Sequence, residues 1–160
     1  MAKTTLIAEP GKQEVVMTHI FDATPERVFQ ALTDPHLIPH WWGPRYLTTT
    51  VDRMEVKPGG LWRFIQRDDT GYEYVFHGVF HDILTPERLT YTFEFEGLPG
   101  HVMLEIVTCE PQAGGKTKLI DKSVYQSVDD RDGMFQSGLE EGATETMERL
   151  AELLVKDLKV

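Results

Sequence analysis

Apolar and polar residues alternate with a period of two through most of the chain, from Tyr46 to Tyr125. Such alternation is typical of strands with one buried and one solvated face. The segments are bounded by glycine, proline or aspartate, and their connections are short enough for hairpins. With no crossover helices between them, parallel pairing is excluded. We predict about six strands, in LTTTVDRMEV, LWRFIQR, YEYVFHGVFHDI, RLTYTFEFE, HVMLEIVTCE and KTKLIDKSVY.

Another strand and two short helices precede this region. Residues 13–21, QEVVMTHIF, are β-branched and apolar enough for the first strand. Thr24 can cap a helix whose first turn accommodates Pro25, and that helix should end near Asp34. Only a short helical connector fits into residues 36–42, because prolines interrupt this part of the chain.

The last thirty or so residues return to a helical period, with acidic residues largely outside the apolar stripe. We predict one long amphipathic helix there. It covers the apolar face of the sheet, whereas the opposite face is exposed to solvent. The fold class is therefore α+β, with a curved antiparallel sheet wrapped around a long C-terminal helix. We expect a flexible segment at 1–12 and a single domain at 13–160. The helix stripe consists of Phe135, Leu139, Gly142, Ala143, Thr146, Leu150, Leu153 and Leu154.

Composition narrows the choice of partners and location. The 160 residues include 41% hydrophobic residues, and 26 acidic against 16 basic side chains give a net charge of −10. Nucleic acid and anionic membranes would be repelled on average. A lone cysteine, Cys109, excludes an intrachain disulfide, and no apolar run is long enough to insert into a membrane. The start of the chain lacks the apolar core of a signal peptide, so we expect a cytoplasmic protein.

Five motifs in order carry a family resemblance: FDATPERVFQALTDP, HWWGP, PGGLWRF, HGVFHDILTPERLTYTFEFEGLPGH and DDRDGMFQSGLEEGATETMERLAELL. From about Val15 to Leu154 the chain resembles homologues of the activator of heat-shock protein 90 ATPase. These belong to the helix-grip (SRPBCC) superfamily, which includes START lipid-transfer domains, pollen-allergen-like proteins and polyketide cyclases. The resemblance implies seven strands, two short helices between the first two, and a cavity under the long helix. It implies no single activity.

The chain departs from the family pattern at three places. His19 stands where the family usually has arginine, and Cys109 stands where an aromatic residue often occurs. Gly142 is followed by Ala143 where many relatives carry a large aromatic residue. If the helix faces the cavity there, the resemblance implies a roomier cavity in this protein.

Rows of aromatic side chains in the strands indicate what lines the expected cavity. Each row shares one strand face by period two, as in Tyr91, Phe93 and Phe95. Gly138 and Gly142, four apart on the helix, supply no side chain and cost helix stability, which suggests space. A simple packed core is the alternative. The predicted cavity residues are Trp41, Trp42, Trp62, Phe64, Tyr74, Phe76, Tyr91, Phe93, Phe95, Phe135, Gly138, Leu139, Gly142 and Thr146.

The connector Trp41-Trp42-Gly43-Pro44 has two interpretations. It is either a lid over the mouth of the cavity or an apolar plug that packs the short helices on the sheet, and the two tryptophans can divide these roles.

Catalytic and metal chemistry have weaker support. His77 and His81 lie too far apart on a strand to share an ion, and Pro39 interrupts the helical spacing of His36 and His40. We expect no metal and no cofactor. Cys109 in a strand is more typical of a small buried hydrophobe than of a nucleophile.

General acid–base chemistry has two candidate residues. Glu105 and Asp121 would qualify only if they pointed inward, and a solvated face is the more common place for such residues. The catalytic residues and the question of whether the protein is an enzyme therefore stay open.

The first functional hypothesis is binding of a small apolar or amphipathic molecule between sheet and helix. A cyclase, dehydratase or hydrolase using the same cavity is an alternative. Another is a co-chaperone of heat-shock protein 90 with a part in the stress response, as the family name suggests. A monomer and a homodimer both remain open, since an exposed edge strand can pair with a second copy.

Overall fold

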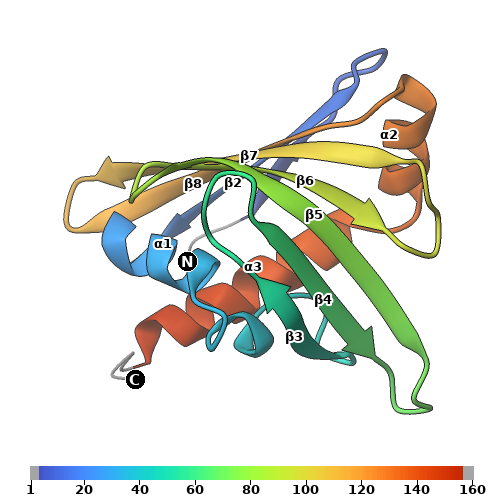
Figure 1. Ribbon diagram of the computed structural model, residues 1–160. Helices are drawn as coiled ribbons and strands as arrows, with labels where there is room; N and C mark the ends of the chain where they lie inside the picture. The colour runs from blue at the N-terminus through green and yellow to red at the C-terminus, as the bar shows by residue number, and fades with distance from the viewer. Residues whose placement is uncertain (1–3, 157–160) are drawn as a thin grey trace.

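Eight strands form one antiparallel sheet in the computed structural model, which describes residues 4–156. The strand order is β1-β2-β8-β7-β6-β5-β4-β3, so β3 to β8 run as a meander and β2 pairs with β8 (Figure 1). The strands are β1 (Thr5–Ile7), β2 (Glu14–Phe21), β3 (Thr48–Met54), β4 (Leu61–Arg67), β5 (Glu73–Leu84), β6 (Arg88–Phe95), β7 (Val102–Gln112) and β8 (Lys116–Val124).

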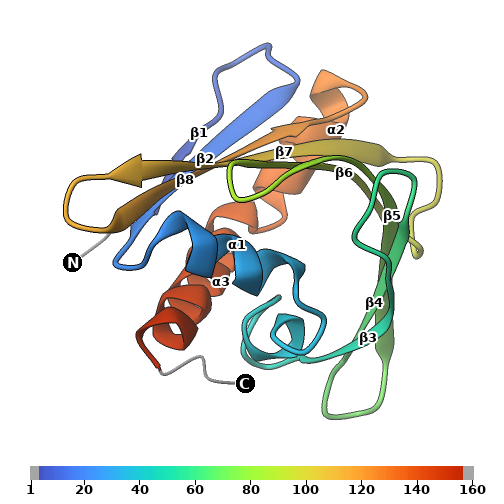
Figure 2. The same cartoon turned by 60° about the vertical axis from the view of Figure 1, so that its left-hand side comes forward.

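The sheet is strongly curved, and α1, η1 and α3 lie on its concave side. Figure 2 shows β3, β4 and β5 standing steeply against β1, β2, β8 and β7, with α3 inside the bend. Two register shifts contribute to this bend, between Val51 and Arg53 in β3 and between Phe80 and Asp82 in β5. The helical elements are α1 (Pro25–Thr33), η1 (Ile38–His40), α2 (Val128–Gln136) and α3 (Leu139–Val155).

The two short helices predicted between the first two long strands are present. The hydroxyl of Thr24 accepts a hydrogen bond from the backbone N–H of Arg27, and Pro25 is the first residue of α1. Asp34 caps the other end of this helix. The connector that follows is the single turn of 3-10 helix η1.

The prediction of seven strands was wrong by one. The eighth is β1, which lies in the segment 1–12 that we expected to be flexible and pairs with β2 through Leu6 and Met17. A three-residue strand alternates over too few positions to be recognised from sequence. Residues 1–3 of that segment, and residues 157–160 at the other end of the predicted domain, lie outside the described residues.

The prediction of one continuous C-terminal helix was also wrong, because the helical region is divided in two. Gly138 has φ 95° and ψ 26°, in the left-handed region that favours glycine, and it separates α2 from α3. A buried arginine, Arg131, fastens α2 to the body of the protein, since its guanidinium donates to the carbonyl of Glu9 over 2.6 Å. The two helices therefore present separate faces rather than one stripe.

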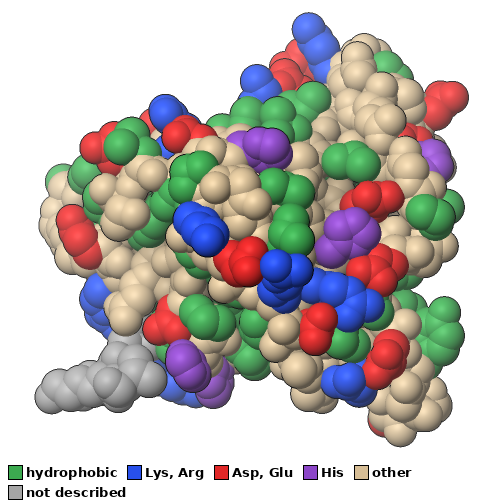
Figure 3. Space-filling model, viewed as in Figure 1, with side chains coloured by type: hydrophobic (Ala, Val, Ile, Leu, Met, Phe, Trp, Pro, Cys, Tyr) green, Lys and Arg blue, Asp and Glu red, His purple; other side chains and the backbone are tan. Residues whose placement is uncertain are grey.

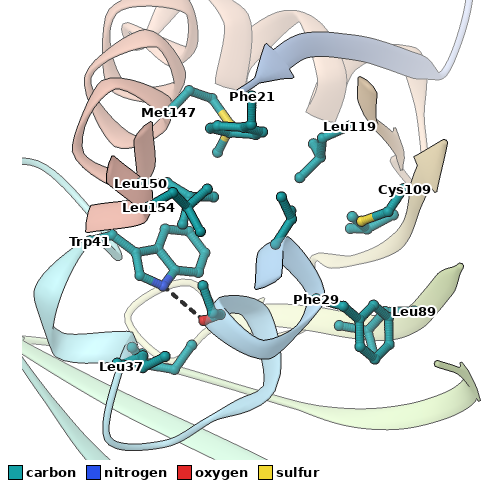
Figure 4. Close-up of a cluster of buried hydrophobic side chains, with 14 of the residues drawn as sticks. Phe21, Phe29, Leu37, Trp41, Leu89, Cys109, Leu119, Met147, Leu150 and Leu154 are labelled. Atoms are coloured by element: carbon teal, nitrogen blue, oxygen red, sulfur yellow. Dashed lines mark hydrogen bonds between the residues drawn. The ribbon is translucent and has the colours of Figure 1, made fainter. Parts of the chain in front are cut away.

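The packed core occupies the end of the molecule that holds α1 and the C-terminal half of α3. Leu150 and Leu154 of α3 meet Phe21 of β2 and Leu119 of β8 in this core (Figure 4). The N-terminal half of α3 lies over the other half of the sheet. No helix within residues 4–156 is long and apolar enough to cross a membrane.

Candidate functional site

A cavity of about 720 Å³ lies between the inner face of the sheet and the N-terminal half of α3. Strands β1, β2 and β4 to β8 contribute to its wall, and so does the segment between η1 and β3. Binding sites for drug-sized ligands commonly have roughly 300–1,000 Å³, so the space suits a molecule of that size.

Aromatic rings of β5 and β6 form one wall of the cavity, and Trp42 faces them. The ring centroids of Phe76 and Phe93 are 5.4 Å apart, and those of Phe76 and Phe95 are 5.1 Å apart. Trp42 lies edge-on to Phe76 at 5.3 Å. We call Trp42, Tyr74, Phe76, Tyr91, Phe93 and Phe95 the aromatic wall.

Ten of the fourteen residues predicted for the cavity line it: Trp41, Trp42, Tyr74, Phe76, Tyr91, Phe93, Phe95, Leu139, Gly142 and Thr146. Trp62 and Phe64 instead border a much smaller hollow of about 40 Å³ beside η1. Phe135 and Gly138 line neither space, because the break at Gly138 turns α2 away from the direction of α3.

Each tryptophan of the connector has a different environment. Trp41 is buried, and its indole N–H donates to the carbonyl of Ala31 over 3.0 Å, which matches the interpretation as a plug (Figure 4). Trp42 forms part of the aromatic wall. Gly43, which follows Trp42 in the chain, has φ 88°. A side chain at this position would collide with the side-chain amide of Gln66. Arg149 of α3 holds this turn by donating to the carbonyl of Gly43 over 2.7 Å.

The face of α3 that looks into the cavity carries little side-chain volume. Gly142 and Ala143 both line the space, and no atom lies within 4 Å of the position that a Cβ of Gly142 would occupy. Gly142 is therefore open toward the cavity rather than in close contact with another backbone. The small side chain of Ala143 adds to the room.

Two carboxyl groups occupy the same cavity wall, contrary to the expectation that both would be solvated. Glu105 pairs with Ser123 in the β7–β8 register and with Tyr91 in the β6–β7 register. Asp121 pairs with Val107 of β7 and Met17 of β2. Because alternate residues share a face, Glu105 and Asp121 are diagonal neighbours on the inner face of the sheet.

The environment of this acid pair favours its protonated forms. Burial raises the pKa of Glu105, against the effect of hydrogen bonds with Asp121 and Ser123. Burial and then repulsion from Glu105 raise the pKa of Asp121 well above its usual range. The side chain of Asp121 is half-buried, because part of its surface faces the cavity rather than bulk solvent. Burial also raises the pKa of Tyr91 strongly, with the two acids adding to the effect.

A second hollow of about 320 Å³ adjoins the cavity below α2. Phe93, Phe95, Tyr125 and Met134 border both spaces. The loop between β6 and β7 is joined to α2 there, because His101 Nδ1 lies 2.9 Å from an oxygen of Asp130. Helix α2 thus forms the wall between the cavity and the outside at this end.

The outer face of the sheet has a different chemistry. Over β3, β4 and β5, acidic and basic side chains lie close together in Figure 3. Arg63 of β4 pairs with Glu96 over 2.8 Å, and His77 of β5 lies 2.9 Å from the same carboxylate. His77 is therefore engaged on the outer face. Residues 4–156 contain no group of three or more histidine, cysteine or acidic side chains arranged to hold a metal ion.

Cys109 and His19 are buried on the inner face outside the cavity. Cys109 is buried as expected, and burial raises the pKa of its thiol to about 12. The ring of His19 is 2.9 Å from the Thr4 hydroxyl through Nδ1, and its buried Nε2 has no partner within residues 4–156. Burial lowers the pKa of His19, against the attraction of Glu148, so the ring is neutral. Neither residue lines the cavity.

Sequence reasoning named Glu105 and Asp121 as acid–base candidates but did not place them on the inner face, although one signal for Asp121 was present. In KTKLIDKSVY, the lysines 116, 118 and 122 share one strand face, and Asp121 shares the other with Leu119 and Tyr125. Lysine is rarely buried, so the lysines mark the solvated face and place Asp121 inside. The inward position of Glu105 follows from its pairing with Ser123. That pairing is known only once the register between β7 and β8 is known.

Fold and cavity together define a helix-grip protein with a hollow interior. The chain belongs to the family of Activator of Hsp90 ATPase homolog 1-like proteins, whose model matches residues 22–155. This confirms the resemblance found in the sequence motifs. The family name describes the action of a relative, and no curated protein matches this chain.

Solved structures share the whole fold. A protein from Rhodobacter sphaeroides is 26% identical, with a TM-score of 0.87 over 95% of this chain and 97% of its own. A protein from Arthrobacter aurescens is 24% identical, with a TM-score of 0.87 over 96% of this chain and 92% of its own. The protein Ms6760 from Mycobacterium smegmatis is 20% identical, with a TM-score of 0.85 over 96% of this chain and 98% of its own.

Proposed function

We propose that this protein binds a small hydrophobic or amphipathic molecule in the cavity under α3. The observation that carries the proposal is the cavity of about 720 Å³ with a wall of aromatic rings. Filling such a space with apolar surface releases roughly 25 cal/mol for each Å² removed from water. Gly142 and Ala143 keep the helix side of the cavity free of bulky side chains.

Naphthylethanol, a neutral aromatic molecule, is a suitable probe. Titration followed by naphthalene fluorescence should give saturable binding of one molecule per chain. Gly142→Phe places a ring in the cavity from the helix side and should weaken this binding by about tenfold or more. Glu140→Phe adds the same ring to an exposed position of α3 and should leave binding unchanged. If neither naphthylethanol nor a broader panel of apolar molecules binds, the proposal fails.

The acid pair supports a second candidate function, an enzyme of the cyclase, dehydratase or hydrolase type. Two carboxyl groups with raised pKa values in an apolar cavity can hold and transfer a proton near neutral pH. Tyr91 beside them adds a hydrogen-bond donor at the same wall.

The enzyme candidate is tested by turnover. Model substrates with enolisable carbonyl or ester groups on aromatic bodies should be converted by the wild-type protein and not by the double variant Glu105→Gln and Asp121→Asn. A double variant that still binds the substrate separates loss of chemistry from loss of binding. Binding without turnover in the wild-type protein would leave the first proposal standing and remove this one.

A further inference from the structure

The cavity lining is asymmetric in charge. Among the described residues that line it, Glu105 and Asp121 are the only ones with ionisable acid or base side chains other than tyrosines. No lysine, arginine or histidine contributes to this wall. Any charge that the cavity wall offers to a ligand is therefore negative.

Two arginines that contact or belong to the segment 43–45, next to the cavity, form other interactions. Arg149 donates to the backbone carbonyls of His40 and Gly43. Arg45 forms a two-pronged pair with the carboxylate of Glu152, at 3.1 and 2.6 Å. Both basic groups belong to the contact between α3 and the turn before β3, so neither neutralises the acid pair.

One oxygen of the acid pair lacks a donor. Asp121 Oδ1 is buried and has no hydrogen-bond partner among residues 4–156. A buried acceptor left without a donor is costly, and this cost adds to that of ionising the acid pair. Two neighbouring carboxyl groups that share one proton carry one net negative charge, which one ligand cation would balance.

We propose that the natural ligand of the cavity is an amphipathic organic cation, an amine with an aromatic or other bulky apolar body. The inference rests on the proposed binding function and specifies its ligand class. The ammonium group donates to Glu105 and Asp121, and the apolar body lies against the aromatic wall. Tyr91 is directly opposite Glu105 in the strand register, so ring and carboxyl surfaces adjoin where the two parts of the ligand meet.

The same features disfavour other amphipathic ligands. A carboxylate or phosphate head group would meet two acids and no base, which is repulsive in an environment of low dielectric constant. A neutral alcohol can donate one hydrogen bond but leaves the charge of the pair unbalanced. Aromatic rings add to the preference for a cation, because a cation is attracted to the face of a ring within about 6 Å.

Three probes with the same naphthalene body and different head groups test the inference: naphthylethylamine, naphthylethanol and naphthylacetate. Calorimetric titration at neutral pH should give the tightest binding for the amine, by about tenfold over the alcohol, and the weakest for the acetate. In the double variant Glu105→Gln and Asp121→Asn, which leaves no carboxyl group in the pair, the amine-to-alcohol ratio should fall toward unity while alcohol binding persists. Glu110→Gln removes the same charge from the outer face of β7 and should keep the wild-type order.

The outcomes separate this inference from the proposed function. If the alcohol or the acetate binds in the cavity as tightly as the amine, the charge preference is wrong and the binding function stands. An amine preference that survives in the double variant would also overturn the inference. If none of the three probes and no other apolar molecule binds, the proposed function itself fails.

Discussion

Glu105 of β7 and Asp121 of β8 are diagonal neighbours on the inner face of the sheet, one residue pair apart in a continuous register. Glu105 is only 7% exposed, and Asp121 has an oxygen with no partner. Buried carboxyl groups without a basic partner are unfavourable for folding when they ionise. Such a pair is retained at a cost in stability, which is typical of a site that a ligand or a reaction uses.

The first prediction concerns the pH dependence of stability. A carboxyl group with a raised pKa binds protons more tightly in the folded state, so its ionisation destabilises the fold as the pH rises from about 4. Asp121→Asn removes this effect and should stabilise the protein by about 1–3 kcal/mol near pH 8, with little change near pH 4. Urea unfolding at both pH values measures the difference between variant and wild type.

The free energy of unfolding at each pH must be compared between variant and wild type, because other acids also make it depend on pH. Hydrogen bonds from Arg63 and Arg45 lower the pKa values of Glu96 and Glu152, respectively. The folded protein therefore loses the stabilising contribution of these two acids as the pH falls. Their contribution is the same in both proteins and cancels in the difference. Glu105, Tyr91 and Tyr125 are the cavity-lining titratable groups that interact electrostatically with Asp121. A stability difference that does not change with pH would contradict the raised pKa of Asp121.

A ring introduced at Gly142 tests whether the space is open in solution. Replacing a helix glycine favours the helix by up to about 1 kcal/mol, whereas overpacking a filled core costs typically about 1–3 kcal/mol. With no atom within 4 Å of the missing Cβ, Gly142→Phe should be neutral or stabilising in urea unfolding. A loss beyond about 2 kcal/mol would show that the position is packed rather than open.

Much of the architecture is predictable from sequence because the strands carry clear local signals. Period-two alternation and short turns identify β3 to β8, and the Thr24-Pro25 start identifies α1. The break at Gly138 is not predictable from amphipathicity, because the apolar stripe continues across it and only the left-handed backbone ends the helix. A glycine in a helical pattern has two meanings, a helix end at Gly138 and an open position inside a helix at Gly142.

The site is less predictable than the fold for a physical reason. Aromatic rows reveal that a strand has an apolar face, but whether that face is filled depends on what lies opposite. Phe93 lines the cavity and Trp62 lies in the packed region, although both alternate in the same way. Which half of the sheet is hollow depends on where α1 and the C-terminal half of α3 pack, as Figure 4 shows for Leu150 and Leu154.

The two tryptophans of the connector should differ in their effect on stability. Trp41→Phe removes the indole donor to the Ala31 carbonyl and opens a gap in the core, so we expect a loss of about 2–4 kcal/mol. The indole of Trp42 donates no hydrogen bond to any residue that the structure describes, and Trp42→Phe should cost less than about 1.5 kcal/mol. Trp42→Phe should instead weaken binding of naphthylethanol. Equal stability losses would contradict separate roles for the two residues.

Alanine substitutions at Gly138 and Gly142 should have opposite signs. Gly138 has φ 95°, where a side chain is strained, so Gly138→Ala should destabilise by about 1–2 kcal/mol. Gly142 lies in the helical part of α3 with open space around its Cα, so Gly142→Ala should stabilise by up to about 1 kcal/mol. Both variants change one hydrogen to a methyl group within the same five residues, and each serves as the control for the other in urea unfolding. If α2 and α3 were instead one continuous helix in solution, both substitutions would stabilise the protein. That result would contradict a helix break at Gly138.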